Sequence, residues 1–145
     1  MRALLDANAL IALSWVQHQH HESMQDWFKK NARFGWSTCA FTQAAFVRVL
    51  LQPAFSGYAL QVNEVVELLM LTTAHAQHQY LSIDFPIRDV QDVCTGGLFG
   101  HRQITDAWLL TAAIRNNHSL VTFDMGIASL LATPAERRKH LIELQ

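Results

Sequence analysis

The chain of 145 residues contains few cysteines, few prolines and no excess of charge of either sign. Its two cysteines, Cys39 and Cys94, are too few for a disulfide framework or a four-ligand zinc site, which favours reduced thiols. Because 11 Lys and Arg residues balance 12 Asp and Glu residues, the chain as a whole has no net attraction to a phosphate backbone. Any contact with a nucleic acid therefore requires a local patch.

Long hydrophobic runs and linkers are absent as well. No apolar stretch approaches the roughly 20 residues that span a bilayer, and Asp6 interrupts the N-terminus before a signal-peptide core can form. We therefore expect a soluble, cytoplasmic protein. No repeat or low-complexity tract divides the sequence, and 50% of its residues are hydrophobic, so we expect residues 1–145 to form a single domain with its own core.

Short apolar runs alternate with helical patterns along the chain. Strands are expected at residues 3–5, 34–37, 80–83, 119–123 and, with weak alternation, 139–144. Helices are expected at residues 9–15, 20–32, 43–51, from after 57 to about 75, 105–117 and 127–131. Since helices rather than hairpin turns separate the strands, the pattern predicts an α/β fold with a mostly parallel sheet covered on both faces.

Polar residues follow several of the apolar runs. Asp6 comes directly after residues 3–5, and Asp124 comes directly after residues 119–123. Asp106 opens the helix that leads into the second of these strands, and Gln43 opens a helix after the run that contains Trp36. In an open parallel sheet, ligands bind beyond the carboxyl ends of the strands, so these side chains are expected at one edge.

Each of the three aspartates, taken alone, is explained by helix capping, because Asp is favoured at helix N-termini. Three carboxylates that converge at one edge repel one another unless a cation neutralises them. Oxygen donors without Cys or His suit Mg²⁺ or Mn²⁺ rather than zinc. The pattern therefore predicts that Asp6, Asp106 and Asp124 hold Mg²⁺ or Mn²⁺, as carboxylates do at many phosphate-processing sites.

Four segments in order carry a resemblance to a known family: residues 5–10, residues 36–50, residues 100–106 and residues 120–124. Over nearly the whole chain the sequence resembles the PIN-domain ribonucleases and, within them, the VapC-type toxins of toxin–antitoxin systems. The resemblance implies a three-layer α/β/α sandwich that binds Mg²⁺ or Mn²⁺, cleaves RNA and is blocked by a cognate antitoxin. Carried across to this chain, Asp6, Asp106 and Asp124 match three of the four acidic positions of the family.

Gln43 departs from that pattern, because the family usually has a glutamate at this position. A glutamine can offer a carbonyl oxygen to a cation or hold a water, but it brings no negative charge, so a lower metal affinity is expected. Three possibilities stay open: an active enzyme that uses three aspartates with Gln43, an enzyme that recruits another acid such as Asp84, and a catalytically degenerate module that acts by binding protein.

The expected reaction is metal-assisted hydrolysis of an RNA phosphodiester bond, without a covalent intermediate. Asn8, Thr105 and Thr122 are expected to orient ligands or waters, although each also fits as an ordinary helix-start or strand residue. His101 and Arg102 follow a glycine-rich loop and precede the third segment's aspartate, where they could meet an RNA phosphate. Their default interpretation is that of solvated surface residues.

Other candidates carry weaker signals. The basic run at residues 137–140 could touch RNA or an acidic antitoxin segment, but it is more typical of a soluble tail. His18, His20 and His21 are interpreted as the polar start of a helix, because no Cys or His at zinc-finger spacing accompanies them. Four Trp and eight Phe in so small a chain suggest apolar surface that a homodimer or the antitoxin would cover.

Overall fold

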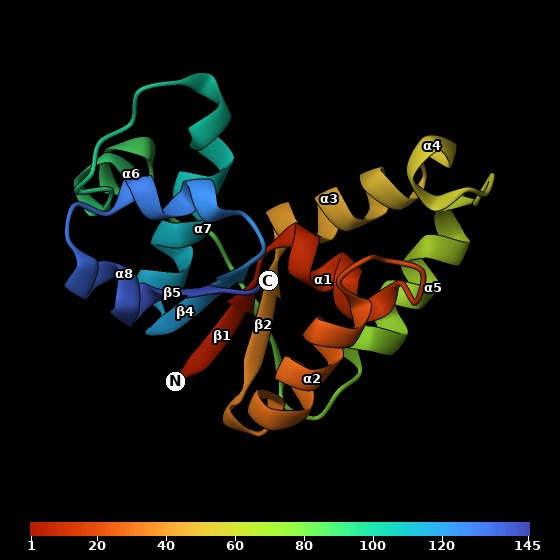
Figure 1. Ribbon diagram of the computed structural model, residues 1–145. Helices are drawn as coiled ribbons and strands as arrows, with labels where there is room; N and C mark the ends of the chain where they lie inside the picture. The colour runs from red at the N-terminus through yellow and green to blue at the C-terminus, as the bar shows by residue number, and fades with distance from the viewer.

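Helices separate all the strands of the chain in a computed structural model that describes residues 1–145 (Figure 1). The elements are β1 (Arg2–Leu5), α1 (Ala7–Ser14), α2 (His21–Asn31), η1 (Ala32–Phe34), β2 (Trp36–Cys39), α3 (Ala40–Leu50), α4 (Pro53–Ser56), α5 (Val62–Thr73), β3 (His78–Leu81), α6 (Ile87–Val93), η2 (His101–Gln103), α7 (Ile104–Arg115), β4 (His118–Thr122), η3 (Met125–Leu130), α8 (Pro134–His140) and β5 (Leu141–Glu143).

The strands form one parallel sheet in the order β3-β2-β1-β4-β5. β1 lies at its centre, where Leu4 pairs with Ser37 of β2 on one side and with Leu120 of β4 on the other. Parallel neighbours need long crossover connections, and the helices of these connections cover both faces of the sheet. The expected α/β fold with a parallel sheet is therefore confirmed.

Two hydrophobic clusters fill the space between the sheet and its helices. Leu4 and Leu5 are consecutive residues of β1, so their side chains point to opposite faces, and both are fully buried. Leu5 packs with α1, α2, α3 and α5, while Leu4 packs with α6, α7 and η3. Each buried leucine contributes about 1.5–3 kcal/mol of transfer free energy. The two clusters make the three layers of an α/β/α sandwich.

The start of α3 differs from the expectation, which placed Gln43 at the first position of that helix. The hydroxyl of Thr42 accepts a hydrogen bond from the backbone N–H of Cys39 at 3.0 Å and donates one to the Cys39 carbonyl oxygen at 3.1 Å. This cap allows the helix to begin at Ala40, directly after β2. Gln43 is therefore the fourth residue of α3.

Other boundaries differ for local reasons. Pro53 was expected only to end the preceding helix, but it also begins α4, because a proline needs no hydrogen-bonded N–H at the first helical position. Gly57, with a left-handed φ of 80°, ends α4, so the expected long helix starts only at Val62 as α5. Strand β3 begins two residues earlier than expected and β4 one residue earlier.

Two further helices, besides α4, were not expected. α6 is a short helix of seven residues after β3. α8 contains the basic run at residues 137–140, which was interpreted as a soluble tail. Its positive side chains lie in the last turn of the helix, where they interact favourably with the negative end of the helix dipole.

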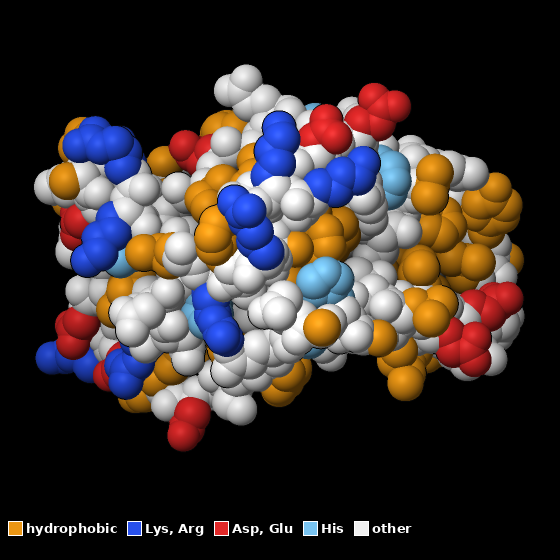
Figure 2. Space-filling model, turned by 90° about the horizontal axis from the view of Figure 1, so that it is seen from below, with side chains coloured by type: hydrophobic (Ala, Val, Ile, Leu, Met, Phe, Trp, Pro, Cys, Tyr) orange, Lys and Arg blue, Asp and Glu red, His pale blue; other side chains and the backbone are white.

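The surface is uneven in composition. Seen from below the view of Figure 1, Lys and Arg side chains gather toward the middle and one end, and hydrophobic side chains gather toward the end that carries α4 and α5 (Figure 2). The exposed apolar residues of that region are Phe55, Tyr58, Val62, Met70 and Leu71. None of the helices has both the length and the apolar character needed to cross a bilayer.

Candidate active site

Two of the three aspartates named from the sequence, Asp6 and Asp124, lie at the carboxyl edge of the sheet after the neighbouring strands β1 and β4, and the third, Asp106, lies near them on α7. Asp6 follows β1 and caps α1, while Asp124 follows β4 by one residue and caps η3. Asp106 is the third residue of α7, the helix that precedes β4. The three carboxylates also act on one another: in addition to burial, which is the larger cause, the charge of Asp124 raises the pKa of Asp6, and the charges of Asp6 and Asp124 raise the pKa of Asp106.

Asp6 is a buried carboxylate with both oxygens engaged. Only 6% of the residue is exposed. Its Oδ1 accepts a hydrogen bond from the backbone N–H of Ala7 at 2.6 Å, and its Oδ2 accepts one from the Thr122 hydroxyl at 2.7 Å. Burial raises the pKa of Asp6, and these hydrogen bonds offset only part of the increase. The fold therefore holds a carboxyl group in one orientation at a position that disfavours its charge.

Thr122 connects the parts of this edge. Its hydroxyl is fully buried, donates to Asp6, and accepts hydrogen bonds from Asn8 Nδ2 at 3.3 Å and from the Asp124 backbone N–H at 2.9 Å. Asn8 also accepts a hydrogen bond from the Phe123 backbone N–H through its Oδ1 at 3.1 Å. The side chains of Asn8 and Thr122 thus tie the start of α1 to the end of β4.

Asp106 and Asp124 are less enclosed than Asp6. Burial and the charges of the other two aspartates raise the pKa of Asp106 to about 6. Asp124 is exposed, and its Oδ1 accepts a hydrogen bond from the Gly126 N–H at 2.7 Å. The one ion pair in the structure joins Arg115 to Asp89, so no basic side chain lies within ion-pair distance of the three aspartates. Their negative charge is left without compensation by the protein.

The donor chemistry of this edge fits Mg²⁺ or Mn²⁺. No three acidic, cysteine or histidine side chains lie close enough together to enclose an ion directly. Mg²⁺, however, usually keeps several of its waters and is bound through only one or two carboxylates. Three carboxylates that disfavour one another's charge, with no basic neighbour, suit a hydrated divalent cation in both charge and donor type.

Gln43 is turned toward the sheet. Its Nε2 donates a hydrogen bond to the buried Thr38 hydroxyl at 3.0 Å, and that hydroxyl lies 2.8 Å from Nε2 of His78 on β3. With the amide nitrogen bound to Thr38, the carbonyl oxygen of Gln43 is free to face another partner. Sequence reasoning did not identify Thr38 or His78, because a threonine within a strand carries no sign of the residue it will meet. Asp84 is exposed after β3, and its charge is not among those that shift the pKa values of Asp6 and Asp106.

The residues proposed for substrate contact lie ahead of Asp106 in the chain. His101 and Arg102 are exposed in η2, and Thr105 is exposed as the second residue of α7. Gln103 fixes this segment, because its Oε1 accepts hydrogen bonds from the backbone N–H groups of Phe99 at 2.7 Å and Gly100 at 3.3 Å. His101 and Arg102 are therefore accessible to solvent a few residues before Asp106 in the chain, and Thr105, expected to orient ligands or waters, directly precedes it.

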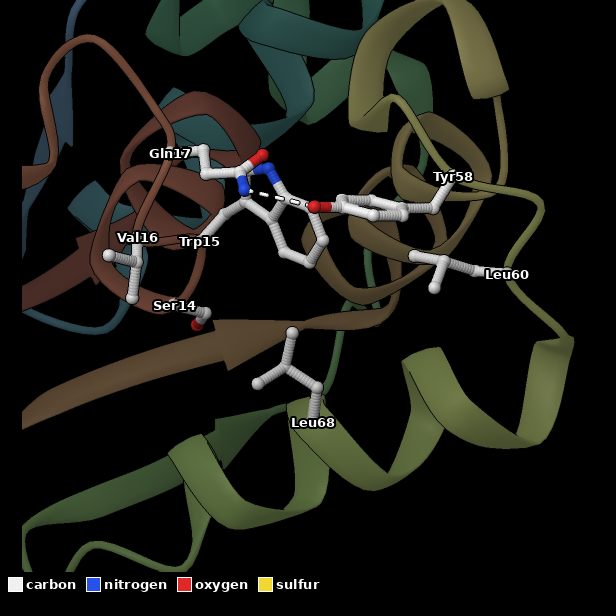
Figure 3. A pocket seen from close by; sticks show the side chains of 7 residues that line it. All are labelled: Ser14, Trp15, Val16, Gln17, Tyr58, Leu60 and Leu68. Atoms are coloured by element: carbon white, nitrogen blue, oxygen red, sulfur yellow. Dashed lines mark hydrogen bonds between the residues drawn. The ribbon is translucent and has the colours of Figure 1, made fainter.

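A groove of about 440 Å³ lies apart from the aspartates, at the far end of α1. Its lining consists of Ser14, Trp15, Val16, Gln17, Tyr58, Leu60 and Leu68, none of them acidic (Figure 3). The rings of Trp15 and Tyr58 meet edge to face at 6.2 Å, and Gln17 Nε2 donates a hydrogen bond to the Tyr58 hydroxyl at 3.2 Å. An apolar lining of this kind suits docking rather than hydrolysis.

The sequence is similar to known proteins over nearly its whole length. The family model described as "PIN domain" matches residues 3–130. Ribonuclease VapC38 of Mycobacterium tuberculosis is 42% identical over 142 residues, which are 98% of this chain and 96% of that protein. Ribonuclease VapC44 of the same species is 38% identical over 144 residues, which are 99% of this chain and 100% of that protein.

Solved structures show the same fold at low sequence identity. VapBC2 from Rickettsia felis, bound to a DNA fragment from its promoter, matches with a TM-score of 0.66 and 14% identity over 100% of both chains. FitAB bound to the IR36 DNA fragment matches with a TM-score of 0.57 and 16% identity, over 97% of this chain and 94% of that chain. These likenesses support the three-layer α/β/α architecture.

Proposed function

Because the chain belongs to the PIN-domain family and to the VapC ribonucleases within it, we propose that it is a ribonuclease toxin of a toxin–antitoxin pair that hydrolyses RNA phosphodiester bonds with Mg²⁺ or Mn²⁺. The observation that carries the proposal is the acidic edge, where burial and the charges of Asp6 and Asp124 raise the pKa of Asp106 to about 6. The family membership agrees with the resemblance found in the sequence. We propose that its substrate is RNA, that its partner is a cognate antitoxin and that it acts in the cytoplasm.

In this mechanism Asp6, Asp106 and Asp124 hold the cation. A bound divalent ion supplies a water of lowered pKa and offsets the negative charge that builds on the phosphate in the transition state. The Thr122 hydroxyl and the Ala7 N–H keep the Asp6 carboxylate in one orientation. Such fixed positions mean that little reorganisation is needed when the substrate binds.

The protonation state of Asp106 matters for this scheme. With a pKa of about 6, the side chain is mostly ionised at neutral pH and becomes protonated in mild acid. Only the ionised carboxylate is a ligand for a hard cation, so cation binding and protonation compete at this residue. The proposed activity is therefore expected to fall as the pH drops below about 6.

Gln43 takes the position of the family's fourth acid. We propose that its carbonyl oxygen contributes a neutral donor to the cation or to one of its waters, while Thr38 holds its amide nitrogen. The cost of the missing charge is a lower affinity for the cation. The second candidate function, a module that acts only by binding protein, is favoured by this same loss of charge.

The remaining contacts are assigned by position. We propose that His101 and Arg102, exposed a few residues before Asp106, meet the phosphates of the RNA, and that Thr105, exposed next to Asp106, orients ligands or waters. The exposed apolar side chains of α5, including Met70 and Leu71, are proposed as the surface that a second copy of the chain or the antitoxin covers.

Purified protein incubated with a varied set of end-labelled RNAs, in Mg²⁺ or Mn²⁺, tests the proposal. We expect cleavage by the wild type and a loss of about a hundredfold or more in Asp106→Asn, since a charged group at the reacting centre is removed. Asp92→Asn, a change at an exposed acid of α6, is the matched control and keeps the activity. Cleavage that survives in both Asp6→Asn and Asp106→Asn contradicts the assignment, and absence of cleavage by the wild type favours the protein-binding module.

A further inference from the structure

Four aromatic rings form a continuous series beside the acidic edge, and the mechanism above makes no use of them. The ring of His20 stacks on Phe123, with centroids 4.4 Å apart and an interplanar angle of 11°. His18 follows at 5.7 Å from His20, and Phe55 of α4 follows at 6.2 Å from His18. The series therefore runs from the end of β4, along the loop between α1 and α2, to α4.

The first ring of the series is attached directly to the acidic edge. Phe123 is the residue between Thr122 and Asp124, so its Cα lies about 3.8 Å from each of theirs. Its backbone N–H donates to Asn8 Oδ1 at 3.1 Å, in the same network that orients Asp6. A polymer whose phosphate lies at the aspartates would therefore have its adjoining units next to these rings.

Hydrogen bonds hold the loop that carries the two histidines. His18 Nδ1 accepts a hydrogen bond from the His20 backbone N–H at 3.0 Å. His21 Nδ1 lies 2.7 Å from the Ala12 carbonyl oxygen, and Gln25 Nε2 donates to the Leu13 carbonyl oxygen at 3.0 Å. These bonds join α2 to the end of α1, so the rings are in place before a ligand arrives.

The outer part of the series is open to solvent. Phe55 is 44% exposed and, with His18, lines a hollow of about 290 Å³ that also includes Trp15, Gln17 and Gln19. Burial and the charges of His20 and His21 lower the pKa of His18, so this imidazole presents a flat, mostly neutral ring at pH 7. Neutral rings with polar neighbours favour flat aromatic ligands over an acidic protein segment, whereas the apolar groove on the other side of Trp15 has the lining that a protein helix prefers (Figure 3).

We propose that His18 and Phe55, the open end of this series, stack on the unpaired bases of a single-stranded RNA whose scissile phosphate lies at the acidic edge, and that the stacked pair of His20 and Phe123 holds this end in place beside that edge. This inference rests on the proposed function and adds the residues that receive the bases of the RNA. Phe and His rings stack on nucleobases of any sequence. A duplex keeps its bases stacked inside the helix and cannot place them on these rings, so an unpaired loop or end is the form that fits.

Fluorescence anisotropy with a labelled uridine octamer, in Mg²⁺ and with Asp106→Asn in every protein to prevent cleavage, measures this binding. Phe55→Ala is expected to weaken RNA binding about tenfold, the typical effect of removing one stacked base. Phe34→Ala is the matched control, because Phe34 is similarly exposed at 51% but lies on η1, and its loss is expected to leave the affinity unchanged. Phe55→Trp keeps a stacking ring and is expected to keep the affinity, and His18→Ala tests the next ring inward.

The outcomes separate this inference from the function on which it rests. Equal affinities of Phe55→Ala and Phe34→Ala, in a wild-type protein that cleaves RNA, overturn the aromatic site and leave the ribonuclease in place. A blunt RNA duplex that binds as well as the octamer, with the same sensitivity to Phe55→Ala, also overturns it. A wild-type protein that neither binds nor cleaves the RNAs overturns both. Circular dichroism of each variant verifies that the exposed substitution has left the fold intact.

Discussion

The two edges of the parallel sheet carry buried titratable groups of opposite kind. Histidines begin two of the strands at the amino edge, His78 in β3 and His118 in β4, and Arg2 begins β1 beside them. Aspartates follow two strands at the carboxyl edge, Asp6 after β1 and Asp124 after β4. Both kinds of side chain lie at the ends of strands of the same sheet. Comparing the two edges therefore shows how burial acts on a basic and on an acidic group.

Burial acts on the two edges with opposite consequences at neutral pH. At the amino edge it lowers the pKa values of His78 and His118, so both rings are mostly neutral at pH 7. At the carboxyl edge it raises the pKa values of Asp6 and Asp106, yet a pKa of about 6 leaves Asp106 mostly charged at pH 7. The two histidines of the amino edge are thus mostly uncharged at pH 7. The carboxyl edge, in contrast, holds a negative charge that burial disfavours. A group that binds there and carries positive charge would remove the penalty.

Thr122→Val is expected to damage the carboxyl edge most. The substitution removes the hydroxyl that donates to Asp6 and accepts from Asn8 and from the Asp124 N–H. We expect the free energy of unfolding in urea to fall by about 2–3 kcal/mol, because buried polar groups lose their partners. Thr111→Val is the control: its buried hydroxyl bonds to the Ala107 carbonyl oxygen and to the Cys94 thiol but to no carboxylate, so a smaller loss is expected. Equal losses for the two variants would show that Thr122 has no special role.

Gln43→Glu is expected to strengthen cation binding at the same edge. The added carboxylate supplies the acid that the family usually has at this position, and we expect the Mn²⁺ affinity measured by calorimetry to rise about tenfold, or about 1.4 kcal/mol. Gln43→Ala removes the amide without adding charge and is expected to give no such gain. A glutamate variant that binds Mn²⁺ no better than the wild type would place residue 43 outside the cation site.

Asp106→Asn is expected to stabilise the protein in the absence of divalent cations. Because the folded-state pKa is raised, this group's contribution is most favourable below pH 3.8 and is lost as the pH rises from 3.8 through about 6. At pH 7.5 we therefore expect the variant to gain about 1 kcal/mol, after allowance for solvent screening of a half-buried group.

Urea unfolding of wild type and Asp106→Asn at pH 3.5 and pH 7.5 measures that difference. The two proteins should differ less at the lower pH, where the wild-type carboxyl is mostly neutral in both the folded and the unfolded state. Millimolar Mg²⁺ should stabilise the wild type more than the variant, since a ligand stabilises only the state that binds it. A variant that is less stable at pH 7.5 would contradict the account of this edge.

His118→Asn tests the amino edge, where the smallest effect is expected. The pKa of His118 is lowered by burial and by the charge of Arg2, so its contribution to stability is present above pH 6.5 and is lost as the pH falls. The variant should show a shallower loss of stability between pH 7 and pH 5.5 than the wild type. Identical slopes would remove His118 as a source of that pH dependence.

The sequence predicted the parts of the fold that depend on local pattern. Asp6 and Asp124 were placed at strand ends because each follows an apolar run, and Asp106 was placed in the first turn of a helix with strong apolar spacing. The helices α6 and α8 were missed because each has only seven residues, too few for a clear periodicity. The basic residues of α8 were interpreted as a tail because four consecutive polar residues show no apolar periodicity, although they form the last turn of that helix.

The sequence by itself determined the layers, the parallel sheet and the edge at which acidic residues gather, because side-chain periodicity and strand ends are local properties of the chain. Only the tertiary structure decided that Thr122 holds Asp6 across 116 positions of the chain, that Thr38 turns the Gln43 amide, and that His20 stacks on Phe123. These contacts depend on which strands and loops become neighbours. Packing of the whole molecule sets that choice, and a pattern of a few residues does not encode it.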